Sequence, residues 1–217
     1  NTANIGRLLP QAFFYPFAFS RIKNKINGNI YYALAPGNYS NVVAGLYAWQ
    51  FALPLNGFII PATDSLTVDA IGEPVLLDSL VPANRRNPSD PSEPSNLERL
   101  EEVFCANKAM MKHFIFPKPI DEADVNAAAK ELYTKYKLYS DRHTARAYAA
   151  SKTHISVDTG EAITVLVARD SPSLSENFVQ HTIGEVPEMP DSIKKSLKQS
   201  NLARPLVKTP EELKKLI

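Results

Sequence analysis

The segment between residues 37 and 41 has the composition of a loop that binds an anion. It follows an apolar run at 30–35 and opens an apolar segment at 41–53 that has the length of a helix. The first backbone N–H groups of a helix have no partner within it, and the helix dipole adds positive potential there. A phosphate group is therefore a natural ligand for this place. The candidate residues are Gly37, Asn38, Tyr39, Ser40 and Asn41.

The residue types in this segment allow two interpretations. Gly37 would let the backbone approach a ligand closely, and Ser40 and Asn41 would add side-chain hydrogen bonds. The same residues also suit an ordinary turn from a strand into a helix, with Ser40 or Asn41 as the capping residue. The local sequence alone leaves both interpretations open.

Two other short segments carry groups that could do chemistry. Asp141-Arg142-His143-Thr144-Ala145 could hold a base or a charge pair, or Asp141 could simply cap a helix that has His143 in its first turn. Residues 168–172 (Ala-Arg-Asp-Ser-Pro) directly follow an apolar run. Ligands of open α/β sheets bind at the carboxyl ends of strands, so this segment is a third candidate. Its alternative is a simple turn between a strand and a helix.

The elements that would position these residues follow from the pattern of apolar residues. Short apolar runs at 30–35, 58–60 and 162–167 predict strands. The helix expected at 41–53 lies between the first two runs, which makes a βαβ unit with parallel strands. Further helices are expected over 4–23, kinked or broken by its two prolines, and over 97–104, 121–137, 143–151 and 172–181. The predicted fold class is α/β, a parallel sheet flanked by helices.

The chain divides at a polar, proline-rich stretch. Residues 1–83 form the α/β part that carries the loop, and residues 84–96 form a Pro/Ser-rich loop. Residues 97–217 supply helical segments and a returning strand that complete the same domain. Three strands are fewer than a doubly wound sheet usually has, which suggests that part of the sequence is missing.

Composition excludes several classes of function. The formal net charge of +1 gives no electrostatic basis for binding nucleic acid or an anionic membrane. No apolar run approaches the roughly 20 residues that span a bilayer, and the N-terminus does not have the pattern of a signal peptide. The single cysteine, Cys105, rules out an internal disulfide and favours a reducing compartment, so a cytoplasmic location is expected. No metal site and no catalytic residue are predicted.

Five segments in order resemble threonine synthase, an enzyme family of fold type II that uses pyridoxal 5'-phosphate (PLP). Residues 1–11 (NTANIGRLLPQ) are similar to the family's Asn-Ser-x-Asn-x-x-Arg-x-x-x-Gln helix start. Residues 37–41 and the Ala-Gly at 44–45 resemble its Gly-Asn-Phe-Gly-Asp/Asn loop and the Ala-Gly that follows. Residues 60–63 (IPAT) match a strand end of the family. Residues 94–99 (PSNLER) and 141–145 (DRHTA) look like its Pro-Ser-Asn-Phe-Glu-Arg and Asp-Pro-His-Thr-Ala segments.

The resemblance implies a fold like that of the tryptophan synthase β chain and a C-terminal portion of such an enzyme. It implies that residues 1–83 bind the phosphate of PLP through the loop, and that Asn1, Thr2 and Arg7 lie near the substrate. The substrate would be a small phosphorylated amino acid, since the family converts O-phospho-homoserine into threonine and phosphate. The family's Schiff-base lysine lies in an N-terminal half that would be a missing partner of this chain, so the chain alone is expected to be inactive.

Three departures from the family pattern indicate a divergent member. Ser40 replaces the second glycine of the loop, and a positive φ at that residue would cost roughly 1–2 kcal/mol. Arg169-Asp170-Ser171-Pro172 replaces the family's Thr-Ala-His-Pro, and Asp64-Ser65-Leu66-Thr67 replaces its Asn-x-Asn-Asp. Arg169 would alter the electronics at the cofactor ring nitrogen or block the ring. Two alternatives stay open, a non-catalytic relative that binds phosphate or a phospholigand, and a purely structural or interaction fragment.

Overall fold

The computed structural model describes residues 5–76, 96–105, 107–154, 162–198, 209 and 214. The helices are α1 (Ile5–Ala12), α2 (Phe14–Ile22), η1 (Lys23–Lys25), α3 (Ser40–Gln50), α4 (Leu97–Val103), α5 (Lys108–Lys112), α6 (Glu122–Tyr136), α7 (Arg142–Lys152), η3 (Pro172–Leu174), α9 (Glu176–Ile183) and α10 (Asp191–Leu197). The strands are β1 (Asn29–Ala33), β2 (Gly57–Pro61), β3 (Leu66–Val68), β4 (Pro74–Leu76), β5 (Ile115–Lys118) and β6 (Ala162–Leu166).

Four parallel strands form the main sheet, in the order β5-β2-β1-β6. The β1–α3–β2 unit has the predicted parallel pairing, with Tyr32 opposite Phe58. The chain runs from β1 through β2 to β5 on one side of β1 and then returns to the other side as β6. The direction of winding therefore reverses between β1 and β6. The predicted α/β class and parallel sheet are confirmed.

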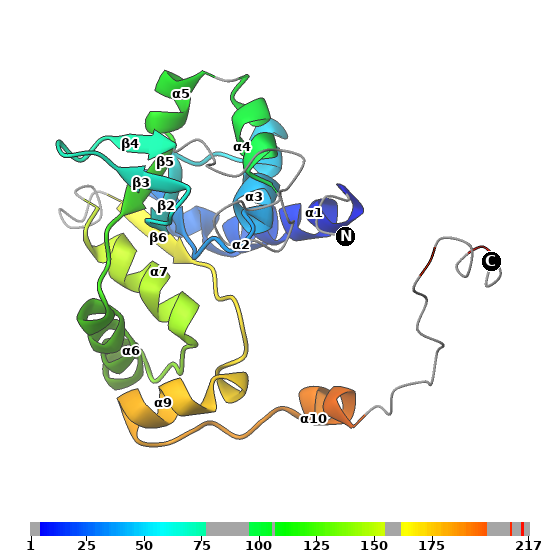
Figure 1. Ribbon diagram of the computed structural model, residues 1–217, viewed down its shortest axis with the longest axis vertical. Coiled ribbons are helices and arrows are strands. Elements are labelled where there is room, and N and C mark those ends of the chain that lie inside the picture. Colours follow the sequence, from blue (N-terminus) through cyan, green and yellow to red (C-terminus); the bar gives the residue numbers. More distant parts are fainter. Residues whose placement is uncertain are drawn as a thin grey trace. The chain divides into compact units, whose positions relative to one another are not determined.

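Helices cover both faces of this sheet (Figure 1). Alternate residues of β1 point to opposite faces, as the pleat of a strand requires. Ile30 and Tyr32 pack with α1, α2, α3 and α4, whereas Tyr31 and Ala33 pack with α6 and α7. Because both faces are covered, the strands read in the sequence as continuous apolar runs rather than as alternating ones.

Several predicted helices are confirmed with shifts of a few residues at their ends. The N-terminal helix is broken, since α1 contains Pro10 and ends at Ala12 before α2 begins at Phe14. Helix α6 begins within the range predicted for it, and Asp121 caps it in a reciprocal capping box with Asp124. The segment predicted as one helix over 172–181 consists of the short η3 followed by α9.

The fourth strand of the sheet, β5, was missed by the sequence prediction. This strand contains Pro117, which pairs with Ile60. Proline has no N–H to donate to a ladder, so it is compatible only with a strand whose donor side is unpaired. The position of β5 at the edge of the sheet supplies that condition.

Residues 1–186 form one compact unit and residues 187–217 form a second. Within the second, α10 carries Lys194, whose Nζ lies 2.8 Å from the Glu188 carboxylate. Most of the proline-rich stretch at 84–96 lies outside the described residues, and so do residues 1–4. No helix in the described part of the chain is long and apolar enough to cross a bilayer.

Candidate functional site

A cleft of about 1270 Å³ opens at the carboxyl ends of β1, β2 and β6. Its walls include the segments that follow these three strands, at 36–41, 62–64 and 167–169, together with side chains from α1, α2 and α7. This is the place where the winding of the sheet reverses, and ligands of open α/β sheets bind there. The cleft lies wholly within the unit formed by residues 1–186.

The three candidate segments of the sequence meet in this cleft. Gly37, Asn38, Ser40 and Asn41 line it, as do His143 and Arg169. Tyr39 does not line the cleft, because its side chain is fully buried beneath the loop. Arg7 lines the cleft from α1, whereas Asn1 and Thr2 lie outside the described residues.

The loop presents the backbone of Gly37, Asn38, Ser40 and Asn41 to the cleft, whereas Tyr39 is fully buried. Helix α3 begins at Ser40, and the residue before it, Tyr39, has a left-handed conformation with φ of 61°. The positive φ that was considered for Ser40 therefore belongs to Tyr39. In the described part of the chain, no hydrogen bond uses the N–H of Gly37, Asn38, Tyr39 or Asn41, whereas that of Ser40 donates to Asn38 Oδ1 at 3.2 Å.

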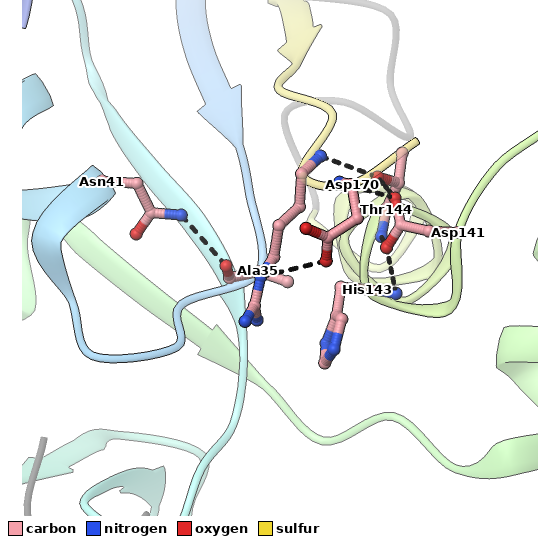
Figure 2. A network of polar contacts seen from close by, with 7 residues as sticks. Ala35, Asn41, Asp141, His143, Thr144 and Asp170 are labelled. Carbon is pink, nitrogen blue, oxygen red and sulfur yellow. Dashed lines mark hydrogen bonds and ion pairs between the residues drawn. The ribbon is translucent and has the colours of Figure 1, made fainter. Parts of the chain in front are cut away.

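Side chains of the loop hold its shape. Asn41 Nδ2 donates to the Ala35 carbonyl oxygen at 3.0 Å, so this amide closes the loop back on β1 (Figure 2). The Tyr39 hydroxyl lies 2.6 Å from Thr63 Oγ1, at the end of β2. Burial raises the pKa of Tyr39 to about 12, so the phenol stays protonated and keeps this contact at neutral pH. The side-chain bond expected from Asn41 to a ligand is thus made within the protein.

Residues outside the loop fix it from both sides. The Tyr15 hydroxyl on α2 donates to the Asn41 carbonyl oxygen at 2.6 Å, and the Tyr32 hydroxyl donates to the Tyr15 carbonyl oxygen at 3.0 Å. Asn96, just before α4, donates from Nδ2 to the Asn38 carbonyl oxygen at 2.9 Å. The loop is therefore held by α2 and by the start of α4, and its N–H groups are pre-oriented for an anion.

On the opposite wall, the buried carboxylate of Asp141 ties α7 to the segment after β6 (Figure 2). Its Oδ1 accepts from the N–H groups of His143 at 2.8 Å and Thr144 at 3.1 Å, so it caps α7 as one interpretation predicted. Its Oδ2 accepts from the Thr144 hydroxyl and from the Asp170 N–H at 3.3 Å. Thr144 Oγ1 in turn accepts from the Arg169 N–H at 3.0 Å.

This network aims the Arg169 side chain at the loop. A Cβ built on Gly37 would lie 3.2 Å from both terminal nitrogens of the Arg169 guanidinium. Gly37 has no positive φ, so its role here is to leave room for that group. The Nε of Arg169 lies 3.5 Å from Asp170 Oδ2, in a pair that is about half exposed.

A titratable imidazole lies beside this arginine. Desolvation in the cleft lowers the pKa of His143, and the positive charge of Arg169 lowers it further. His143 is therefore neutral at pH 7, when an imidazole can accept a proton at one nitrogen and hold one at the other. Among the described residues, no cluster of three or more His, Cys, Asp or Glu side chains could hold a metal ion.

The sequence analysis overlooked Arg146, a further basic residue of the cleft. Arg146 lines it from α7, and its Nε is buried without a hydrogen-bond partner in the described structure. Its spacing was a usable signal, because residues three apart on a helix share one face and Arg146 follows His143 by three. The cleft wall thus combines a cradle of N–H groups with guanidinium groups from three elements, which suits a phosphate ester.

Curated relatives of this chain are threonine synthases, although no family model matches it. The chain is 32% identical over 154 residues to the threonine synthase of Buchnera aphidicola from Schizaphis graminum, an alignment that covers 68% of this chain and 34% of that enzyme. It is 24% identical over 194 residues to the enzyme of Escherichia coli, covering 89% of this chain and 44% of that enzyme. The chain thus spans between a third and a half of the length of these relatives.

Solved threonine synthases share the fold. The crystal structure of the Escherichia coli enzyme superposes with a TM-score of 0.70 at 23% identity, and it covers 100% of this chain and 50% of that one. A PLP-bound threonine synthase from Brucella melitensis gives a TM-score of 0.61 at 18% identity, covering 89% of this chain and 46% of that one. The chain therefore belongs to the threonine synthase family, as a divergent member that corresponds to part of the length of its relatives.

Proposed function

We propose that the loop at residues 37–41 holds the phosphate of PLP, and that the complete protein is a threonine-synthase-like lyase. The observation that carries this proposal is the set of unused N–H groups at Gly37, Asn38 and Asn41, residues that line one end of a large cleft beside the start of α3. A helix start of this kind supplies both donors and positive potential for a phosphate. Membership of the threonine synthase family supports PLP as the bearer of that phosphate.

The residues present fit this cofactor. The cleft, at about 1270 Å³, exceeds the range of roughly 300–1000 Å³ that is typical of small-ligand sites, so it has room for cofactor and substrate together. The loop would bind the phosphate through its backbone, while Tyr15 and Asn96 keep that backbone in place. When bound, PLP supplies an electron sink for chemistry at the α-carbon of an amino acid.

The substrate proposed for the complete protein is O-phospho-homoserine, a small phosphorylated amino acid. Arg7 and Arg146 line the cleft and carry charges that complement a carboxylate or a phosphate. Neutral His143 lies in the same cleft and can accept a proton there. No lysine of this chain is assigned as the anchor of the cofactor, so we infer that the chain alone does not catalyse turnover.

The test is an assay of the complete gene product. Its sequence before Asn1 is read for a lysine with the family's flanking residues, and the protein is mixed with PLP and O-phospho-homoserine. Release of phosphate together with threonine, only when PLP is present, supports the proposed lyase. A protein that binds PLP or phosphate but releases neither product supports the alternative, a non-catalytic relative that binds a phospholigand. A protein that binds neither contradicts both.

A further inference from the structure

We propose that Arg169 is a phosphate ligand in its own right, and that its guanidinium completes the loop at residues 37–41 as a site for a phosphate monoester. This inference rests on the proposed function of the loop. It adds to that function a side chain that lies on the other wall of the cleft and that would decide how strongly a doubly charged group is held.

The first step is the position of the guanidinium. Its two terminal nitrogens lie 3.2 Å from the point where a Cβ on Gly37 would be, so the group rests against the loop at its first residue. The unused N–H group of Asn38 follows directly in the chain, and that of Asn41 lies in the first turn of α3. A phosphate on these N–H groups would be within reach of an arginine fork, which binds phosphate oxygens in pairs.

The second step is that the backbone of Arg169 is fixed while its charge is available. The Arg169 N–H is held by Thr144 Oγ1, and the next N–H, of Asp170, is held by the buried Asp141. The only ion pair of the guanidinium among the described residues is with Asp170, at 3.5 Å from Nε. That pair is about half exposed, and such pairs contribute little, so an incoming phosphate competes with it easily.

The third step is the charge of the surroundings. Arg7, Arg146 and Arg169 line the cleft together with Asp64, and Asp170 and the buried Asp141 lie beside it, so the charges of this region are nearly balanced. The Asp141 carboxylate is already bonded to the N–H groups of His143, Thr144 and Asp170, so it does not compete for the guanidinium of Arg169. The donors left for a phosphate are the guanidinium groups and the unused N–H groups of the loop, which suit a doubly charged ligand better than a neutral one.

The experiment measures binding to the intact chain by calorimetry, with inorganic phosphate, PLP and phosphate-free pyridoxal as probes. Arg169→Gln is compared with Arg142→Gln, a control in which the same charge is lost from an exposed pair with Glu122 outside the cleft. Arg169→Gln is expected to lower the affinity for phosphate and for PLP by about 10- to 100-fold while leaving the affinity for pyridoxal unchanged. Arg142→Gln is expected to change the three affinities by less than about 2-fold, and Arg169→Lys is expected to restore part of the affinity that Arg169→Gln loses.

A variant that is expected to bind phosphate more tightly keeps the test independent of folding defects, because a folding defect would weaken binding. Asp170→Asn removes the carboxylate that competes for the guanidinium, so phosphate is expected to bind about 2- to 5-fold more tightly. If the wild-type chain binds phosphate and Arg169→Gln binds it equally well or better, this proposal is wrong and the loop proposal stands. If the wild-type chain does not bind phosphate at all, both proposals are wrong.

Discussion

Replacing Asp141 by Asn tests whether the cleft wall depends on a buried carboxylate or only on a helix cap. Asn and Asp cap helices about equally well, so the capping contribution of Oδ1 is nearly unchanged by the substitution. The loss falls on Oδ2, which accepts from the Thr144 hydroxyl and the Asp170 N–H. If the Asn side-chain NH₂ takes the place of Oδ2, it is a donor that faces these two donors. If the amide is flipped, its NH₂ takes the place of Oδ1 and faces the N–H groups of His143 and Thr144 instead.

The magnitude follows from burial and from the number of bonds lost. Asp141 is only 1% exposed and Thr144 is 5% exposed, so water has little access to replace the acceptor that the Thr144 hydroxyl loses. A hydrogen bond to a charged group contributes about 1.5–3 kcal/mol, and either amide orientation forfeits two such bonds while gaining little. We expect Asp141→Asn to lower the free energy of unfolding by about 2–4 kcal/mol.

The chain contains a matched control for this substitution. Asp121 caps α6 in the same way, but in the exposed capping box its carboxylate accepts a single backbone N–H, from Asp124 at 2.8 Å. Asp121→Asn is expected to change the free energy of unfolding by less than about 0.5 kcal/mol. Urea denaturation followed by circular dichroism measures both variants. Equal effects at the two positions would refute the role assigned to the Oδ2 bonds.

Two further predictions concern packing and pH. Gly45→Ala would place a Cβ 2.6 Å from the Phe58 ring, so urea denaturation should show a free energy of unfolding lower by about 1–3 kcal/mol. Adding Phe58→Leu makes room for that Cβ, so the double variant should lose less stability than the sum of the two single variants, and additive losses would contradict this contact. His154 lies between the rings of Tyr31 and Phe116, and burial there lowers its pKa in the folded state. The contribution of this neutral imidazole to the free energy of unfolding should therefore be complete above about pH 6.5 and should be lost as the pH falls through the lower folded-state pKa. Urea denaturation at a series of pH values measures this dependence. His154→Phe should reduce this pH dependence and the exposed His181→Gln should not; an unchanged slope in His154→Phe would contradict it.

Local sequence was enough to predict the elements whose apolar residues and caps agree. Strand β1 and helix α3 follow from a continuous apolar run, a Gly-Asn turn and a second apolar run, because each element obeys its own periodicity. Strand β5 could not be predicted in this way, because Pro117 is acceptable only at an edge. Which strand lies at an edge depends on the pairing of segments that are distant in the sequence.

The site was predictable as a set of segments but not as a set of contacts. The loop, Asp141 and Arg169 were each singled out from local patterns, and the sheet brings them to one cleft. The approach of Arg169 to Gly37 arises from the pairing of β1 with β6, which joins residues more than a hundred positions apart. The left-handed residue is Tyr39 rather than Ser40 because α3 begins one residue earlier than its apolar pattern indicated.

The most direct measurement follows the backbone amide signals of residues 37–41 by NMR while inorganic phosphate is added to the chain. Binding at the loop predicts saturable shifts at Gly37, Asn38 and Asn41, because their N–H groups are free to donate and these residues line the cleft. Amides in the middle of α6, on the opposite face of the sheet from α3, serve as the internal control and should not move. An absence of shifts at the loop in millimolar phosphate would contradict the proposed phosphate site.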